Sequence, residues 1–342
     1  MLPLKLVGGY GSPYSRKMRA VLRYRRIEFR WIMRGSAADA GIAPVPVALI
    51  PVLVVPGENG APDEAMIDST FQIKRLEKLF AARSLIPPDP ALAFLQEILE
   101  DYGDEWLTKP MFHYRWKYAA DIHKASHVLA LDRDLHLSDE RLAKMSAYFA
   151  ERQIARLGVV GSGEVTAPVI EDSYRRLLHL LDDHLKAGNY FLMGSRPGAG
   201  DFGIFGQLSQ LAHFDPTPAS IAARETPRIV SWVSHMDDLS ALEAAEWPRR
   251  DSLAPTLRGF FVEIGRVYAP FLIANARAIG SGAERVECEI DGRPWIQQPF
   301  PYQAKCLKWL REGHAALAAA DRAFVDSHLA GTGAEAIFTS NI

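Results

Sequence analysis

The stretch GYGSPYSRKMR, residues 9–19, joins a glycine-rich turn to the start of a basic helix. Ser12 is a good N-cap and Pro13 is a good first helical residue, and an apolar stripe follows them. Alternating apolar residues flank this helix at 2–7 and at 27–33. The spacing therefore predicts a β-α-β unit whose two strands are parallel.

The next segments extend this unit into a small domain. The apolar runs at 51–55 and 65–67 predict two more strands, and Asn59-Gly60 between them is a hairpin turn signal. Ser69 stands three residues before Gln72, which fits a capping box and predicts a helix from residue 69. The order of elements is then β-α-β-β-β-α, ending at the proline-rich linker LIPPDPAL.

Helical periodicity dominates the rest of the chain, and no convincing strand is found up to about residue 242. Helices are predicted near 91–118, 139–157, 168–187, 200–213 and 226–240. Beyond residue 252 we expect a long helix, a hairpin with Asp291-Gly292 at its turn and a last helix around 301–329. We therefore predict three parts, at 1–82, 90–245 and 252–342.

Composition narrows the class of protein. The 342 residues are 48% hydrophobic and 23% charged, with a net charge of -2, so we expect a globular protein without a nucleic-acid partner. The two cysteines exclude a disulfide framework, and no metal-ligand spacing is found. The apolar stretch at 259–280 contains three charged residues and is a poor membrane span. With no signal peptide pattern, we expect a cytoplasmic protein.

Four motifs, taken in order, resemble the glutathione transferase superfamily. SPYSRKMR at 12–19 resembles its active-site loop and first helix, and LIPVLVV at 49–55 resembles its cis-proline segment. MIDSTFQI at 66–73 is similar to the motif that opens its third helix. GSRPGAGDFGIFGQL at 194–208 resembles its buried capping motif, with Asp201 at the acidic position. The resemblance covers residues 1 to about 245. It implies an α/β thioredoxin-like N-terminal domain and an all-α second domain.

Ser12 is the candidate catalytic residue. A helix N-terminus attracts anions, and a hydroxyl there can donate a hydrogen bond to a thiolate, which lowers the pKa of the thiol. The alternative is that Ser12 only caps the helix. Tyr10 is the runner-up, because a phenol can make the same bond. Ser12 and Ser15 occupy the frame of a Cys-Pro-Tyr-Cys redox motif, but oxygen in place of sulfur rules out disulfide exchange.

Four further residues are implied by the resemblance to hold glutathione. Pro51 is expected to follow a cis bond, so that the backbone of Ile50 pairs with the cysteinyl part of the tripeptide. Ser69 would hold the γ-glutamyl carboxylate and Asp68 the γ-glutamyl ammonium. The alternatives are an ordinary trans-proline and a capping box without a ligand.

A weaker set of residues is predicted to form walls of an acceptor-substrate pocket. Its members are Tyr14, Tyr102, Trp106, His113 and Arg115. The alternative is a helix that packs its aromatic side chains inward and pairs its charges. The basic run from Arg16 to Arg26 is predicted to be a solvated helix face.

The resemblance implies an enzyme in which a bound glutathione thiolate, with glutathione as co-substrate, attacks a small apolar electrophile. A homodimer is also implied. One alternative is a non-catalytic binding or scaffold protein, favoured because the loop 34–49 lacks a lysine for the glycine carboxylate of glutathione. Another is a glutathione-dependent lyase, isomerase or ether-cleaving enzyme. The sequence also has Gly198 where the family's capping motif has Ser or Thr.

Overall fold

The computed structural model describes residues 3–57 and 61–341. The chain forms two compact units. The first comprises Met1–Leu85, Arg115–Gln153 and Phe205–Ala244, and the second comprises Ile86–Tyr114, Ile154–Ile204 and Ala245–Ile342. The three-part division drawn from the sequence stays a prediction. The turn predicted at Asn59-Gly60 lies outside the described residues.

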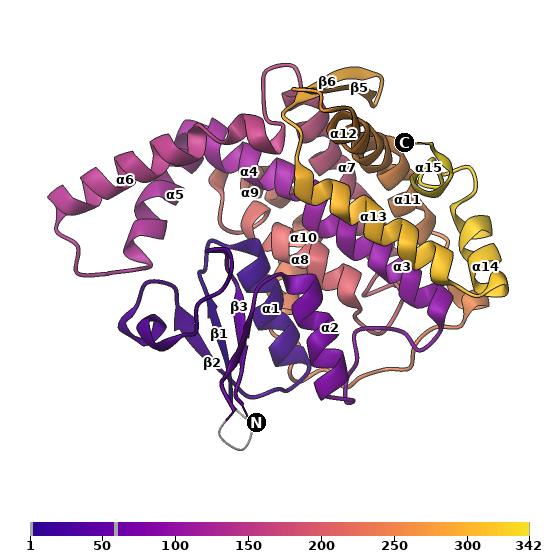
Figure 1. The fold of residues 1–342 in the computed structure, drawn as a ribbon, viewed down its shortest axis with the longest axis horizontal. Coiled ribbons are helices and arrows are strands. Elements are labelled where there is room, and N and C mark those ends of the chain that lie inside the picture. The colour runs from indigo at the N-terminus through magenta and orange to yellow at the C-terminus, as the bar shows by residue number, and fades with distance from the viewer. Residues whose placement is uncertain (1–2, 58–60, 342) are drawn as a thin grey trace. The chain divides into compact units, whose positions relative to one another are not determined.

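The first unit is built around a four-stranded mixed sheet (Figure 1). Its order is β2-β1-β3-β4, with β1 at Leu4–Gly8, β2 at Phe29–Met33, β3 at Val52–Val55 and β4 at Glu64–Met66. Strand β1 pairs parallel with β2 and antiparallel with β3, and β3 pairs antiparallel with β4. Helix α1 (Pro13–Tyr24) joins β1 to β2, and α2 (Ser69–Leu79) follows β4. The predicted thioredoxin-like topology is confirmed.

The two faces of this sheet are covered differently. Helices α1 and α2 lie on one face of the sheet (Figure 1). Leu4 and Leu6 are fully buried, and Leu6 is paired in the register with Trp31, whose ring lies 5.5 Å from the Arg19 guanidinium of α1. Val7 follows Leu6 in β1, so its side chain points to the other face of the sheet, and so does that of Val52, its partner in β3. That face is covered by the connection between β2 and β3, whose only helical segment is the 3-10 turn η1 (Ala37–Gly41).

Helices complete the first unit. They are α5 (Ala119–Leu131), α6 (Asp139–Ile154), α9 (Pro216–Glu225), α10 (Pro227–Asp237) and the C-terminal parts of α4 (Thr108–Lys117) and α8 (Ala199–Leu211). Helix α10 packs against α1 and α9, and α9 packs against α5. The sequence did not predict α5 or α9 as separate helices.

The second unit is mostly helical. Its elements are α3 (Pro90–Asp101), η2 (Tyr102–Trp106), the start of α4, η3 (Leu157–Val160), α7 (Ala167–Lys186), the start of α8, η4 (Arg250–Ser252), α11 (Leu257–Glu263), η5 (Ile264–Tyr268), α12 (Ala269–Ser281), β5 (Val286–Ile290), β6 (Arg293–Gln297), α13 (Pro301–Ala316), α14 (Ala319–Leu329) and α15 (Ala336–Thr339). Helices α13 and α14 pack against α3, and α11 packs against α7 (Figure 1). Strands β5 and β6 pair around Asp291-Gly292, where the sequence predicts a hairpin turn.

Two π-helical turns interrupt helices of the second unit. The turn η2 separates α3 from α4, so the helix predicted over 91–118 is not continuous. The turn η5 separates α11 from α12 and packs against η2. Close contact is possible at η2 because Gly103 has no side chain: an added Cβ would lie 2.8 Å from the carbonyl carbon of Gly203. Within the described residues, no helix has the length and apolar character needed to cross a membrane.

Candidate functional site

The loop before α1 holds Ser12 in the geometry of a helix cap. The Ser15 N–H donates to Ser12 Oγ at 3.2 Å, and Pro13 is the first helical residue. Behind this cap, the Gly9 N–H donates to Ser15 Oγ at 3.3 Å. Because the Ser12 oxygen accepts the capping bond, its hydroxyl hydrogen can still be donated to an acceptor. Capping and donation to a thiolate are therefore compatible at Ser12.

Two glycines beside this cap, Gly8 and Gly11, are closely packed against neighbouring side chains. A Cβ added to Gly8 would lie 2.6 Å from Ser15 Oγ, and one added to Gly11 would lie 2.1 Å from Leu129 Cδ2 of α5. Larger residues at either position would displace the loop or the side chains behind it. The glycine-rich turn therefore allows the loop to lie directly on α5.

Arg115 supports the same loop rather than lining a pocket. Its side chain is buried and makes a forked ion pair with the fully buried Asp215, with Nε–Oδ1 and Nη2–Oδ2 both 2.9 Å. Arg115 Nη1 donates to the Gly11 carbonyl at 2.6 Å. Gln210 accepts from Arg115 Nη2 at 2.7 Å and donates to the Tyr10 carbonyl at 3.2 Å. The pocket-wall prediction for Arg115 is corrected, because its guanidinium is used in this network.

Tyr10, the runner-up for catalysis, lies at the surface of the loop with 42% of its area exposed. Its ring is 5.6 Å from that of Trp31, and the Arg19 guanidinium lies 5.2 Å from the Tyr10 centroid. Tyr14 is half-buried in the first turn of α1. The Tyr10 ring therefore packs against Trp31 and covers the Arg19 guanidinium.

The cis-proline segment is held by the side chain of Gln72, which the sequence pattern predicted to be part of a capping box. The Ile50–Pro51 peptide bond is cis, as the resemblance implied. Gln72 Nε2 donates to the Pro51 carbonyl at 2.9 Å and to the Met66 carbonyl at 2.8 Å. Gln72 therefore joins the start of β3, the end of β4 and helix α2. The predicted capping box between Ser69 and Gln72 is wrong, because Asp68 is the N-cap of α2 and Ser69 is already the first helical residue.

Asp68 is the observed N-cap of α2. Its carboxylate accepts from the Thr70 N–H at 3.1 Å, and its φ of 75° is unusual for a residue other than glycine. Backbone strain of this kind clusters at active sites, ligand clamps and switch regions. Ser69 is the first helical residue, and the buried Lys17 donates from Nζ to Ser69 Oγ at 3.2 Å. Nothing in the local sequence pattern indicates this pair, which links α1 to α2.

The basic run of α1 is not a solvated face, contrary to the prediction. Lys17, Arg19 and Arg25 are buried. Arg25 pairs with Glu77 at 2.9 Å, and its guanidinium also contacts the carbonyls of Phe80 and Ala82. Three arginines of α1 converge on Asp237 at the end of α10: Arg16, Arg19 and Arg23. The run therefore anchors α1 to its neighbours in the first unit.

Three of the predicted pocket-wall residues lie in the interior of the second unit. Tyr102, Trp106 and His113 are each 0% exposed. The Trp106 ring lies 5.5 Å from that of Trp295, and the His113 nitrogens contact Ser162 Oγ at 2.8 Å and Glu171 Oε1 at 3.0 Å. The pocket-wall prediction is not supported for these residues. Inward packing, the alternative weighed above, describes them.

Lys109 is buried in an aromatic cage beside Trp106. Its Nζ lies 3.8 Å from the Phe271 ring centroid and donates to Gln297 Oε1 at 3.0 Å and to the Val160 carbonyl at 3.2 Å. Burial lowers the pKa of Lys109 to about 7, against the opposing effect of Glu105. The cage joins α4 to β6 and α12 within the second unit.

This cage predicts a pH-dependent stability. Between ~pH 7 and ~pH 10, the unfolded chain binds more protons at Lys109 than the folded chain does, so stability rises with pH across this window. We expect Lys109→Met to lose this rise, because methionine keeps the packing and removes the proton. Urea unfolding of both proteins at the two ends of the window measures the difference. Equal pH slopes in the two proteins would show that the ammonium is fully stabilised by its cage.

Asp201 caps α8 as the resemblance implied. It accepts from the Leu192 N–H at 2.8 Å and from the Gly198 N–H at 2.9 Å, and burial raises its pKa to about 7. At Gly198, an added Cβ would lie 2.5 Å from Gln96 Cδ, and Gln96 Oε1 accepts from the Gly200 N–H at 2.8 Å. Gln96 of α3 thus provides the cap that a hydroxyl at 198 would otherwise supply.

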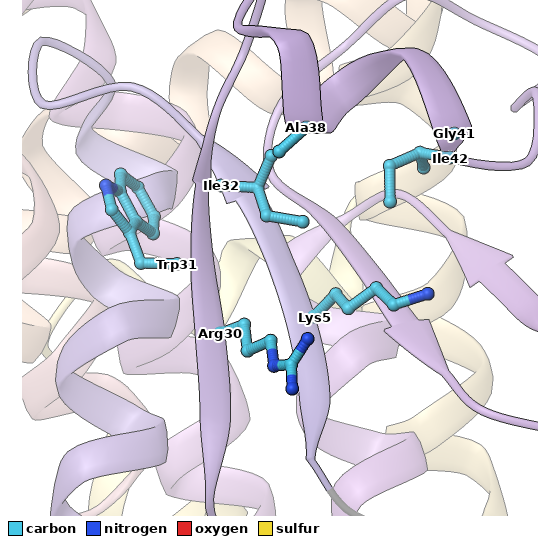
Figure 2. Close-up of a pocket in the computed structure, with 7 residues that line it drawn as sticks. All are labelled: Lys5, Arg30, Trp31, Ile32, Ala38, Gly41 and Ile42. Carbon is cyan, nitrogen blue, oxygen red and sulfur yellow. The ribbon is translucent and has the colours of Figure 1, made fainter.

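A cleft in the first unit lies away from Ser12. It is lined from β1, β2 and η1, on the face of the sheet opposite to α1 (Figure 2). Within residues 3–57 and 61–341, no group of three or more His, Cys, Asp or Glu side chains is placed to hold a metal ion. The candidate site therefore consists of five residues of the first unit: Ser12, Ile50, Pro51, Asp68 and Ser69. Gln72 links the Pro51 segment to α2, and Lys17 links α1 to Ser69.

Comparison with known proteins agrees with the fold of this unit. Residues 6–84 match the family model of the glutathione S-transferase N-terminal domain. The chain is similar to the uncharacterized GST-like protein YibF of Escherichia coli K12, with 33% identity over 103 residues. That match covers 30% of this chain and 48% of the relative, so it spans about half of the curated relative's length.

Solved structures are also similar to the chain. One is a glutathione S-transferase of Methylobacterium radiotolerans in complex with glutathione sulfonate, at 17% identity and a TM-score of 0.42, covering 72% of this chain and 96% of that one. Another is the Tau class enzyme of mango, at 18% identity and a TM-score of 0.39, covering 75% and 94%. The family model covers nearly all of the four-stranded sheet and both of its helices. Residues 6–84 of this chain are therefore similar to the N-terminal domain of glutathione S-transferases.

Proposed function

We propose that this protein binds glutathione in its first unit and uses the bound thiolate to attack a small apolar electrophile. The observation that carries the proposal is the capping geometry of Ser12. Its oxygen accepts from the Ser15 N–H, which leaves its hydroxyl hydrogen for a thiolate at the N-terminus of α1. A hydrogen bond to the charged form, together with the helix dipole, lowers the pKa of a thiol.

The tripeptide would be held by three segments that the structure connects. The backbone of Ile50, before the cis-proline, would pair with the cysteinyl unit. Ser69 would bind the γ-glutamyl carboxylate at the start of α2, and Asp68 would pair with the γ-glutamyl ammonium. The strained φ of Asp68 and the Gln72 contacts support a segment held in place for a ligand.

Titration calorimetry with glutathione tests this proposal. We expect saturable binding of glutathione and of S-methylglutathione, because the peptide contacts do not depend on the thiol. We expect weaker binding of cysteinylglycine, which lacks the γ-glutamyl group that Asp68 and Ser69 would hold. No binding of any of the three would overturn the proposal.

Lys17 provides a sharper prediction for the γ-glutamyl end. Its ammonium donates to Ser69 Oγ and places a positive charge beside the start of α2, where the γ-glutamyl carboxylate would bind. We expect Lys17→Met to weaken glutathione binding roughly tenfold, about 1.4 kcal/mol, because a charge-assisted contact is lost. Calorimetry measures the change.

Two controls accompany this variant. Arg23→Met removes a cation from the same helix that pairs with Asp237, and it should leave glutathione affinity unchanged. The affinity for cysteinylglycine should be the same in Lys17→Met and the unmodified protein. A loss of affinity for both ligands would show that Lys17 supports the fold of the site and not the carboxylate.

A non-catalytic binding or scaffold role is the second candidate, and one observation favours it. The cation that opens the 34–49 loop, Arg34, is paired with Asp39 at 3.0 Å. The resemblance implies a basic group for the glycine carboxylate of glutathione in this loop. Glutathione binding without any change in the pKa of its thiol would support the scaffold role. A lyase, isomerase or ether-cleaving reaction would share the bound thiolate and differ in the electrophile.

A further inference from the structure

The face of the sheet opposite to α1 carries a cleft of about 600 Å3, which falls in the size range of small-molecule sites. The connection between β2 and β3 covers this face only in part, because none of the residues of its turn η1 is buried. The sheet beneath is apolar, with Val7, Val52 and Val54 buried and Ile32 and Ile42 packed against them.

The cleft has an apolar end and a cationic end. Ile32 points toward Ala38, Gly41 and Ile42 at one end, while Arg30 extends across the sheet at the other (Figure 2). Trp31 points to the opposite side of β2 (Figure 2). The alternation of strand residues explains this arrangement, since Arg30 and Ile32 lie two residues apart on one face.

Among the described residues, Arg30 is the cation of the cleft that has no acidic partner. Lys5 is its partner in the register of β1 and β2, but Lys5 Nζ is already paired with Asp63 at 3.0 Å. In the part of the chain that the structure describes, no acidic side chain forms an ion pair with Arg30, and its side chain is exposed. An arginine fork next to an apolar surface suits a carboxylate that is attached to an apolar body.

We propose that this cleft binds an aliphatic carboxylate, with the carboxylate on Arg30 and the chain against Ile32 and Ile42. The site is separate from the proposed glutathione site, because the residues that would hold the ligand, Arg30, Ile32 and Ile42, lie on the other face of the sheet from α1. Binding here does not depend on Ser12 or on glutathione. The two proposals can therefore fail independently.

Dodecanoate and dodecanol, both below the concentrations at which they form aggregates, test this assignment by calorimetry on the full chain. We expect dodecanoate to bind more tightly than dodecanol. Arg30→Gln should weaken dodecanoate binding roughly tenfold or more and leave dodecanol binding unchanged. Arg75→Gln is the matched control, because Arg75 pairs with Glu64 at 2.8 Å and is outside the cleft, and it should change neither affinity.

A second variant fills the apolar end of the cleft. An added Cβ at Gly41 meets no atom within 4 Å, and Gly41 is not among the residues with positive φ, so a side chain can start here without a clash. Gly41→Trp then places a large ring beside the apolar end, which Gly41 lines. We expect Gly41→Trp to abolish the binding of both ligands while the circular dichroism spectrum is retained. Dodecanoate affinity that is unchanged in both Arg30→Gln and Gly41→Trp, or no saturable binding to the unmodified protein, would overturn the proposal.

Discussion

Arg115→Met should lower the free energy of unfolding by about 3–5 kcal/mol, the largest loss of stability that we expect from a single substitution near the site. The side chain of Asp215 is 0% exposed, so removing Arg115 leaves a buried carboxylate without its cation. The Gly11 carbonyl and the Gln210 amide oxygen lose their donor at the same time. Urea unfolding monitored by circular dichroism measures the loss.

The double variant Arg115→Met/Asp215→Asn separates stability from positioning. Removing both charges should recover much of the lost stability, because no unpaired charge remains buried. The Gly11 carbonyl is still without its donor, so glutathione affinity should not recover to the same extent. If affinity and stability recover together, Arg115 acts only on folding and the loop does not depend on its contact with Gly11.

Ser12→Ala should raise the pKa of the bound glutathione thiol toward its ordinary value of about 8.5 and slow glutathione conjugation to an aryl halide. The hydrogen bond to a charged group is worth about 1.5–3 kcal/mol, which corresponds to roughly tenfold to hundredfold in rate. Steady-state kinetics near neutral pH measures the change. The loss of the cap should also cost about 1 kcal/mol of stability, which unfolding measures separately.

Two variants serve as controls for this effect. Ser12→Thr keeps the hydroxyl and the cap and should retain most of the activity. Tyr10→Phe removes the phenol of the runner-up residue and should leave the rate unchanged, because the Tyr10 ring packs on Trp31 and Arg19 without the hydroxyl. A loss of activity in Tyr10→Phe with none in Ser12→Ala would move the thiolate contact to Tyr10.

Local patterns predicted the sheet and α1 well, because strand alternation and N-terminal capping act within a few residues. They did not predict α9, whose prolines at 216 and 218 look like helix breakers. Proline is tolerated in a first turn, where the N–H groups have no partner within the helix. The π turn η2 was missed for a different reason: its Gly103 lies close to the backbone of Gly203, and no local pattern shows a contact between residues so far apart in the chain.

The helix cap at Ser12 and the cis bond at Ile50–Pro51 were predictable because each depends on residues that follow one another in the chain. The contacts that hold these segments in place were not predictable, because they join residues that are distant in the chain. Lys17 and Ser69 are 52 residues apart, and Arg115 and Gly11 are 104 apart. A basic run such as that of α1 looks solvated from the sequence, since nothing local shows that Asp237 meets three of its arginines.

The pKa of the bound glutathione thiol is the most direct test of the central claim. The ultraviolet absorbance of the thiolate, titrated against pH with glutathione bound, reports this pKa. We expect a value below the ordinary ~8.5, with the shift lost in Ser12→Ala. A bound thiol that titrates at its ordinary pKa, with or without the Ser12 hydroxyl, would contradict thiolate activation at the N-terminus of α1.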